Sequence, residues 1–441
     1  MANCAAWSGE RNIHWSATNG VLKKKQRGLP HWRGFCYHSQ LAEWADDGQN
    51  ASELNRSGVG PENGVFARSA MSLLPVRIAG TGSFLPGPPV SSDRLEAVLG
   101  TLDQAPPKVK SFLSSVGPKM LGEGGVKTRH FAVDPETGNM THNFSSLAEE
   151  AARRALDMAK MEPQDIQLLI ISCPSYDQST PPTSALLQER LGIQACAEME
   201  IHSNCTGVGK GVQVAYDALR TGRYKTALVC YSQLSSIYLR SCYFKQSKMD
   251  KVHAALRWIL ADGAGALVLT GGDHGKPDHE IIGTYVESVG AGRPSGMTAG
   301  GAAADLMRKD HQIPELYNDG THHLWQDFTA VNDNAAPLLL QGLINFTTQM
   351  KIDSSTVDHY VVSIPTLQLY ERHIPAFLDR LRITRDKIKF RSDKIGYCGG
   401  SATLLHLDEM VRTGELKSGQ LAIVHAVESS KWMTAGFAVR W

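Results

Sequence analysis

The sequence predicts an α/β protein built from two copies of one supersecondary unit. From Pro75 onward, short β-branched runs alternate with amphipathic stretches of helical spacing, which is the order expected of an α/β chain. Four segments of the first half recur in the same order in the second half. With 441 residues, 42% of them hydrophobic, the chain is long enough to bury a sizeable core.

The recurring segments pair strand with strand and helix with helix. The clearest pair is CTGVGKGVQVAYDALRTG and YCGGSATLLHLDEMVRTG, each read as a helix ending in Arg-Thr-Gly. The four pairs, given by their first residues, are Ile170 and Val361, Cys205 and Tyr397, Ala227 and Ala422, and Ala261 and Thr434. One match has little weight, but four in the same order indicate a duplication.

Three regions follow from this pattern. The Gly- and Pro-containing stretch GGDHGKPDHE separates a first half, residues 71–275, from a second half, residues 276–441. Residues 1–70 lack sustained periodicity, so we expect an N-terminal extension without regular structure. Because Met71 directly precedes the first predicted strand, either a translation start there or a variable tail fits the sequence. Residues 290–329 are rich in Gly and Ala and give no clear element.

Composition excludes several classes of function. Lysine plus arginine (45) nearly balances aspartate plus glutamate (44), so we expect no nucleic-acid partner. The eight cysteines form no CxxC pair, which favours reduced thiols in a cytoplasmic protein. No segment approaches the roughly 20 apolar residues of a membrane span. His311, His322 and His323 lack the spacing of a zinc site, so we expect no metal.

Cys205 is the candidate nucleophile. The run EMEIHSNCTGVGKG predicts a strand, a sharp turn at the cysteine, and a helix with Gly207 and Gly209 in its first turn. A thiol at a helix N-terminus faces unpaired N–H groups and the positive end of the dipole, which favour the thiolate. The glycines allow close approach of backbone and substrate. The alternative is a small buried residue, as most free cysteines are.

The order of motifs resembles that of the β-ketoacyl-acyl-carrier-protein synthase III group of the thiolase superfamily. The motifs are IAGTGSFLP, the cysteine turn, GRYKTALV, ADGAGALVL, and GELKSGQLAIVHA with AVRW, and they cover about residues 75–441. The resemblance implies a duplicated thiolase-like αβαβα sandwich with two pseudo-symmetric halves, and a homodimer. It implies that Cys205 takes an acyl group from coenzyme A or from the phosphopantetheine of an acyl carrier protein, with no tightly bound cofactor.

Two positions depart from that family. Where the family has a histidine in an HQAN-like motif, the sequence reads SIPT, with Ser363 first and Thr366 last. Where it has an asparagine in a GNTS-like motif, the sequence has Tyr397. A hydroxyl is no substitute for imidazole as a base near neutral pH, and a phenol differs from a carboxamide in shape and acidity. We therefore do not expect ordinary malonyl-decarboxylating condensation.

The C-terminal loop departs as well, because HAVESSKW stands where the family has a run of glycines. Glu428 is a candidate general base, or a residue that orients the acceptor; the alternative is a solvated carboxylate or one paired with Lys431. His425 is the preferred imidazole partner for Cys205, against the alternative of an ordinary buried histidine. Backbone N–H groups of Cys205 and this loop are candidates for an oxyanion hole.

These observations favour an acyltransferase in fatty-acid, polyketide or specialised-metabolite biosynthesis that works through a thioester on Cys205. One alternative is a carbon–carbon-forming ketoacyl synthase with a non-standard site. Another is a non-catalytic partner subunit of a thiolase-like heterodimer. The acyl chain, the acceptor and the choice between O-, N- and C-acylation stay open.

Overall fold

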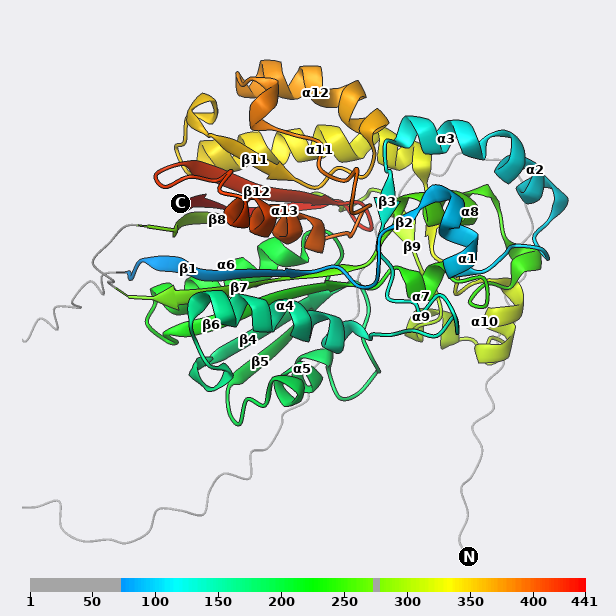
Figure 1. Cartoon of the computed structure of the whole chain (residues 1–441), viewed down its shortest axis with the longest axis horizontal. Coiled ribbons are helices and arrows are strands. Elements are labelled where there is room, and N and C mark those ends of the chain that lie inside the picture. The colour runs from blue at the N-terminus through cyan, green and yellow to red at the C-terminus, as the bar shows by residue number, and fades with distance from the viewer. Residues whose placement is uncertain (1–72, 273–277) are drawn as a thin grey trace, which may run out of the picture. The chain divides into compact units, whose positions relative to one another are not determined.

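Nine strands form one mixed sheet in the order β11-β12-β13-β8-β1-β7-β6-β4-β5 (Figure 1). The computed structural model describes residues 73–272 and 278–441, so the prediction for residues 1–70 lies outside the described residues. The strands are β1 (Val76–Phe84), β4 (Leu168–Cys173), β5 (Ala197–His202), β6 (Thr226–Gln233), β7 (Gly263–Gly271), β8 (Glu280–Ser288), β11 (His359–Val362), β12 (Leu421–Glu428) and β13 (Met433–Arg440). Two small pairs stand apart, β2 (Val90–Ser91) with β3 (Thr128–Arg129) and β9 (Met297–Thr298) with β10 (Trp325–Gln326).

The sheet consists of two matching halves, which confirms the predicted duplication. In the first half β4 pairs in parallel with β6, and β6 and then β1 pair antiparallel with β7. In the second half β11 pairs in parallel with β12, and β12 and then β8 pair antiparallel with β13. The halves meet where β1 faces β8, through the single paired position of Arg77 and Glu280.

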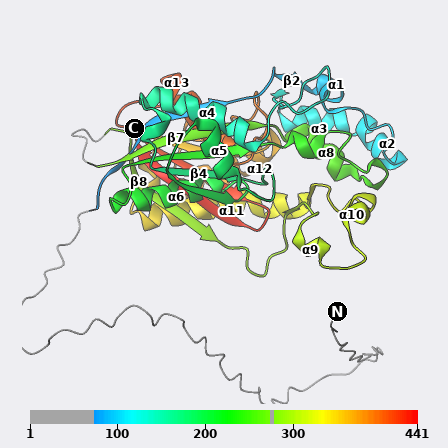
Figure 2. The same cartoon turned by 90° about the horizontal axis from the view of Figure 1, so that it is seen from below.

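Helices fill three layers around these two half-sheets (Figures 1 and 2). Helices α6 and α13 lie between the half-sheets, α4 packs on the outer face of the first and α11 on that of the second. The helices are α1 (Leu95–Leu99), α2 (Pro107–Ser115), α3 (Gly117–Gly124), α4 (Phe144–Ala159), α5 (Thr183–Leu191), α6 (Gly207–Arg220), α7 (Ser236–Leu239), α8 (Lys251–Ile259), α9 (Ala303–Leu306), α10 (Ile313–Asp319), α11 (Phe328–Gln349), α12 (Leu367–Leu381) and α13 (Ser401–Arg412). The fold is the predicted thiolase-like αβαβα sandwich.

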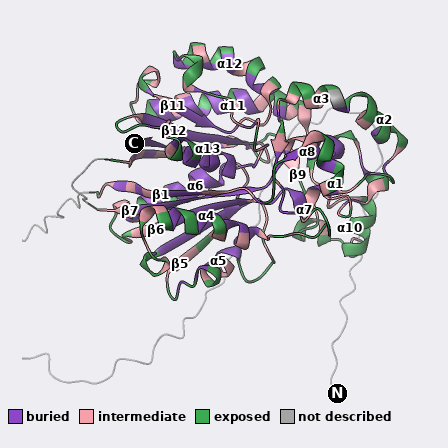
Figure 3. Cartoon of the chain, in the orientation of Figure 1, coloured by how far each residue is buried: buried purple, intermediate pink, exposed green. Residues whose placement is uncertain are grey.

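The central helix α6 contacts both half-sheets and is buried over its first turns, whereas Val214 and Asp217 are exposed. Figure 3 shows the strands and the middle layer as the buried part of the molecule. The first turns of α6 are glycine-rich for a steric reason. A Cβ on Gly209 would lie 2.6 Å from the backbone nitrogen of Gly436 in β13, and one on Gly207 would lie 2.7 Å from the ring of Tyr231 in β6. Glycine at these positions thus lets the helix approach both half-sheets.

One prediction was wrong. Residues 290–329 were expected to give no clear element, yet they contain the β9–β10 pair and the short helices α9 and α10. These elements are only two to seven residues long, too short to produce a periodic pattern in the sequence.

No helix of the described ranges is long and apolar enough to cross a membrane. Within those same ranges, no group of three or more His, Cys, Asp or Glu side chains is arranged to hold a metal ion.

The packing of α6 gives the first testable prediction. We expect Gly209→Ala to cost about 1–3 kcal/mol of unfolding free energy, because its methyl group overlaps backbone of β13. Gly122→Ala in α3 is the matched control. A Cβ there meets nothing within 4 Å, so this change should be neutral or should stabilise by about 0.5–1 kcal/mol. Urea unfolding measures both; equal midpoints for the two variants would contradict the packing of α6.

Candidate active site

Cys205 lies at the predicted strand–turn–helix junction. Strand β5 ends at His202, α6 begins at Gly207, and the cysteine stands in the turn between them. Its side chain lines a cavity of about 650 Å³, a size typical of small-molecule sites. The candidate nucleophile therefore faces this cavity.

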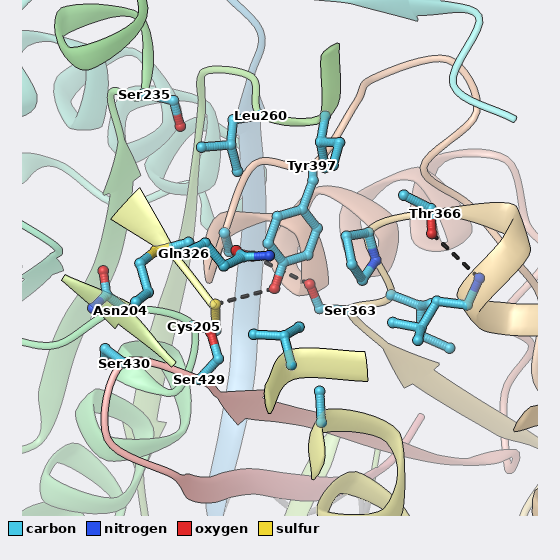
Figure 4. A pocket seen from close by; sticks show the side chains of 18 of the residues that line it. Asn204, Cys205, Ser235, Leu260, Gln326, Ser363, Thr366, Tyr397, Ser429 and Ser430 are labelled. Atoms are coloured by element: carbon cyan, nitrogen blue, oxygen red, sulfur yellow. Dashed lines mark hydrogen bonds between the residues drawn. The ribbon is translucent and has the colours of Figure 1, made fainter. Parts of the chain in front are cut away.

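Tyr397 is the direct partner of the sulfur. Its hydroxyl oxygen lies 3.0 Å from Cys205 Sγ (Figure 4). Ser363 donates to the carbonyl oxygen of Gly399, 3.3 Å away, and its hydroxyl lies close enough to Tyr397 to lower the pKa of that phenol. All three side chains line the same cavity, so three of the five predicted site residues come together.

The thiol of Cys205 is protonated at neutral pH. Burial raises its pKa to about 12, the hydrogen bond with Tyr397 opposes this rise, and the charge of Glu428 adds to it. Burial likewise holds the pKa of Tyr397 well above its usual value. The pKa is therefore raised, contrary to the thiolate expected at the helix N-terminus, because removal from water outweighs the hydrogen bonds that lower it.

Glu428 lies behind the turn and is not part of the cavity wall. Its Oε2 accepts hydrogen bonds from the hydroxyls of Ser203 (2.7 Å) and Thr206 (2.5 Å) and from the backbone N–H of Thr206 (3.3 Å). Its Oε1 accepts one from Ser430 at 2.7 Å. Burial raises its pKa, but these hydrogen bonds outweigh burial and leave the pKa below its usual value. Glu428 is therefore ionised and fully engaged.

The environment of Glu428 differs from the alternatives considered for it. Its side chain is neither solvated nor paired with Lys431, whose ammonium donates instead to the carbonyl of Arg293 at 2.6 Å. The nearby cation is Lys210, which donates to Ser203 Oγ at 2.8 Å and lowers the pKa of Glu428.

His425 is not brought to the sulfur. It lies on β12 three residues before Glu428, so strand alternation turns the two side chains to opposite faces. Its ring packs near those of Tyr285 and Phe346, with centroids 5.9 Å apart in both cases, and neither ring nitrogen has a hydrogen-bond partner. Burial lowers its pKa to about 3, so the imidazole is neutral. His425 matches the alternative of an ordinary buried histidine.

Several cavity residues were not singled out from the sequence. Near the sulfur, Figure 4 shows Asn204, Gln326 and Ser429 among the side chains of the wall. Gln326 belongs to the short strand β10 and had no motif to mark it. Thr366 lines the cavity too, and its hydroxyl caps α12 by accepting from the N–H of Leu369 at 3.3 Å.

Comparison with known proteins fits this geometry. Models of 3-oxoacyl-[acyl-carrier-protein] synthase III match residues 199–290, and models of its C-terminal domain match residues 348–441. The β-ketoacyl-[acyl-carrier-protein] synthase III of Caldanaerobacter subterraneus is 27% identical over 366 residues, covering 82% of this chain and 97% of the relative. That of Methylococcus capsulatus is 26% identical over 356 residues, covering 79% and 94%. The chain is a synthase III-like member of the thiolase superfamily.

A solved structure supports the fold of this synthase III-like chain. The tetronic acid condensing enzyme AbyA1 superposes with a TM-score of 0.67 at 23% identity, covering 83% of this chain and all (100%) of that one. The two family models and the curated relatives together support a thiolase-like condensing acyltransferase.

The raised pKa of Cys205 predicts how its reactivity depends on pH. Below a pKa of about 12 the thiolate fraction grows tenfold per pH unit, so alkylation by iodoacetamide should rise without a plateau from pH 7 to pH 10. Peptide mass spectrometry measures the rate at Cys205, with N-acetylcysteine as the control thiol. Tyr397→Phe removes the hydrogen bond that lowers this pKa, so alkylation should slow further. A plateau below pH 9 would contradict the buried neutral thiol.

The lowered pKa of Glu428 predicts acid-dependent stability. A carboxylate with a depressed pKa stabilises the fold above the unfolded-state pKa of 4.5 and loses that contribution as the pH falls through the folded value. We expect Glu428→Gln to cost about 1–3 kcal/mol at pH 7, with a smaller cost at pH 4. Urea unfolding at both pH values measures this, and the half-exposed Glu409→Gln is the control. A cost independent of pH would show that the charge is not involved.

Proposed function

We propose that the protein is an acyltransferase in which Cys205 accepts an acyl group from an acyl-CoA or an acyl carrier protein. The observation that carries this proposal is the contact of Cys205 Sγ with the Tyr397 hydroxyl, at the wall of a largely apolar cavity. A covalent thioester divides a difficult transfer into two easier steps. The names of the relatives, which specify the acyl carrier protein, support this class of donor.

In the first step, Cys205 Sγ attacks the thioester carbonyl of the donor and the donor sulfur leaves as a free thiol. The proton released by Cys205 passes to that leaving sulfur. Tyr397 stands in hydrogen-bond contact with Cys205 and Ser363 contacts Tyr397, so we assign these two hydroxyls to the proton transfer. Backbone N–H groups of Cys205 and of the Ser429–Ser430 turn are the proposed oxyanion hole.

Glu428 takes the role of a positioning residue in this scheme. Its carboxylate holds Ser203 and Thr206 on either side of Cys205 and holds Ser430 of the loop. Glu428 does not line the cavity, and both of its carboxylate oxygens already accept hydrogen bonds. We therefore do not assign it the proton transfer. The neutral, enclosed ring of His425 takes no part.

The second step offers two candidates. In simple transfer, an oxygen or nitrogen of the acceptor attacks the thioester. In condensation, a carbanion attacks it; the relatives' names, ketoacyl synthase and condensing enzyme, favour this candidate. Ser363 and Tyr397 stand where the resembled family has the histidine and asparagine that promote decarboxylation of malonyl donors. The carbanion would therefore have to come from a donor that forms it without these two residues. A product with a new carbon–carbon bond, detected by mass spectrometry over a panel of carbanion donors, separates condensation from simple transfer.

Three further assignments belong to the same proposal. We place the protein in the cytoplasm, as a homodimer, in fatty-acid or polyketide-type biosynthesis. The family resemblance and the reduced-thiol pattern support them. The alternative of a non-catalytic subunit requires a thiolase-like partner chain, and Cys205 would then be dispensable.

The decisive test is acyl loading of the purified full-length chain. After incubation with acyl-CoA donors of two to sixteen carbons, intact-protein mass spectrometry should show the mass of one acyl group, and Cys205→Ala should show none. Cys242→Ala, at an exposed cysteine, is the matched control and should load like the wild type. Equal loading of Cys205→Ala, or no adduct with any donor, would contradict the proposed function.

A further inference from the structure

The wall of the cavity at Cys205 contains one permanently charged side chain. Among the described residues that line the cavity there is no Asp, Glu or Lys, and Arg129 is the single arginine. Two histidines, His202 and His373, line it as well, and burial lowers the pKa of His373, which favours its neutral form. The wall therefore carries the positive charge of Arg129 and no carboxylate to balance it.

Arg129 lies on β3 and is exposed by only 1%. All three of its nitrogens donate to neutral oxygens. Nε donates to the carbonyl of Trp258 at 2.6 Å, Nη1 to the hydroxyl of Ser92 at 3.1 Å, and Nη2 to the carbonyl of Val126 at 3.5 Å. No ion pair of the described residues includes Arg129, and burial alone lowers its pKa to about 10, so the guanidinium is charged at neutral pH.

A buried cation of this kind lacks the partner that normally offsets the cost of burial. Removing an ion from water is costly, and an opposite charge usually compensates for that cost. Arg257 is also buried, at 4% exposure, but the charge of Glu96 raises its pKa. No charge of the described residues has this effect on Arg129. An anionic group of a ligand in the cavity would supply the missing partner.

The free N–H groups of Arg129 match a carboxylate. An arginine has one N–H at Nε and two at each terminal nitrogen, and Arg129 uses one N–H of each nitrogen within the protein. One therefore remains on Nη1 and one on Nη2, which suits the two oxygens of a carboxylate. A phosphate carries a charge of about −1.5 to −2 at pH 7 and has three acceptor oxygens, more than these two groups satisfy.

Tyr397 links Arg129 to the reacting sulfur. A Cβ on Gly396 would lie 2.9 Å from Arg129 Cγ, so the stem of the arginine packs against the residue before Tyr397. Leu260, two residues beyond the carbonyl group that accepts from Nε, pairs with Tyr397 in an isolated bridge. The hydroxyl of Tyr397 then reaches Cys205 Sγ. A substrate that spans from the sulfur to the guanidinium therefore has a chain about as long as a tyrosine side chain.

We propose that Arg129 binds a carboxylate of the substrate, and that the substrate keeps this carboxylate through the reaction. The proposal rests on the proposed function for the thioester at Cys205, and it adds the class of substrate, an acyl donor or an acceptor with a free carboxylate. An ion pair in enclosed surroundings stabilises the carboxylate and so opposes its loss as carbon dioxide. A malonyl group that decarboxylates is therefore not the ligand of Arg129.

Loading of Cys205 tests whether the acyl donor carries the carboxylate. Succinyl-, glutaryl- and adipyl-CoA are compared with butanoyl-, pentanoyl- and hexanoyl-CoA, which have the same chain lengths without the second carboxylate. Intact-protein mass spectrometry should show the best of the three acids loading at least tenfold faster than its neutral partner. In Arg129→Met this ratio should fall at least tenfold. A loss of folded protein lowers both rates and leaves the ratio unchanged.

Release of an acyl group from Cys205 tests whether the acceptor carries the carboxylate. Wild type loaded with an acetyl group is offered 4-hydroxybutanoate or its methyl ester. The hydroxyl oxygen attacks the thioester carbonyl, the C–S bond breaks, and the hydroxyl proton passes to the Cys205 sulfur. The acid should remove the acetyl mass at least tenfold faster than the ester, and Arg129→Met should abolish this difference. A preference in one assay identifies the substrate that carries the carboxylate; a preference in neither overturns the proposal.

Arg257→Met is the matched control for the loss of a buried guanidinium. Arg257 donates to the carbonyl of Gly100 and does not line the cavity. This variant should lose stability like Arg129→Met and keep the wild-type preference for the acid. An equal loss of preference in both variants would show that Arg129 is a structural clamp only, and would contradict the proposal.

A binding measurement separates failure of this proposal from failure of the proposed function. Titration calorimetry on Cys205→Ala, which forms no thioester, should show glutaryl-N-acetylcysteamine binding at least tenfold more tightly than its methyl ester. This measurement needs no change at Arg129. The same result without any adduct on wild type would support the carboxylate site and contradict acyl transfer. Equal binding of acid and ester, with no preference for the acid as acceptor, would contradict the carboxylate site and leave acyl transfer intact.

Discussion

The buried carboxylate of Glu428 is the constraint on which the geometry of the site depends. It belongs to the second half of the duplication, yet it accepts hydrogen bonds from Ser203 and Thr206, which flank Cys205 in the first half. A buried charge of this kind is costly unless it is fully hydrogen-bonded, and loss of its partners commonly costs about 3–5 kcal/mol. The two halves are thereby fixed against each other at the place where Cys205 meets Tyr397.

The duplication explains why two hydrogen-bonded residues come from distant parts of the chain. Cys205 and Tyr397 begin matching segments, and the helices that follow them, α6 and α13, form the middle layer together. Glycines at positions 207 and 209 bring α6 against both half-sheets. The meeting of the two segments at 3.0 Å is thus a result of the pseudo-symmetric packing.

The fold and the place of Cys205 in a turn between a strand and a helix could be predicted from the sequence, because both are encoded in local patterns. Strand and helix periodicity, the repeated segments and the glycines after Cys205 are all visible within short windows. The state of Cys205 is not, since its pKa of about 12 comes from burial by residues of both halves. The sequence does encode that His425 and Glu428 point to opposite faces of β12, because they are three residues apart on one strand. Which of these two faces lies toward Cys205 depends on how the sheets pack, and this is not visible in the sequence.

Where the resembled family has an imidazole and a carboxamide, this chain has the hydroxyl groups of Ser363 and Tyr397. This difference changes which chemistry the site favours. Because the pKa of Tyr397 is held well above its usual value, its side chain stays a neutral phenol near neutral pH. A neutral phenol is a poor base but a hydrogen-bond donor. A thioester formed on Cys205 as proposed would therefore have a donor at hand for its carbonyl oxygen and a weak base for activating water. Slow hydrolysis of that proposed thioester would give an acceptor time to bind.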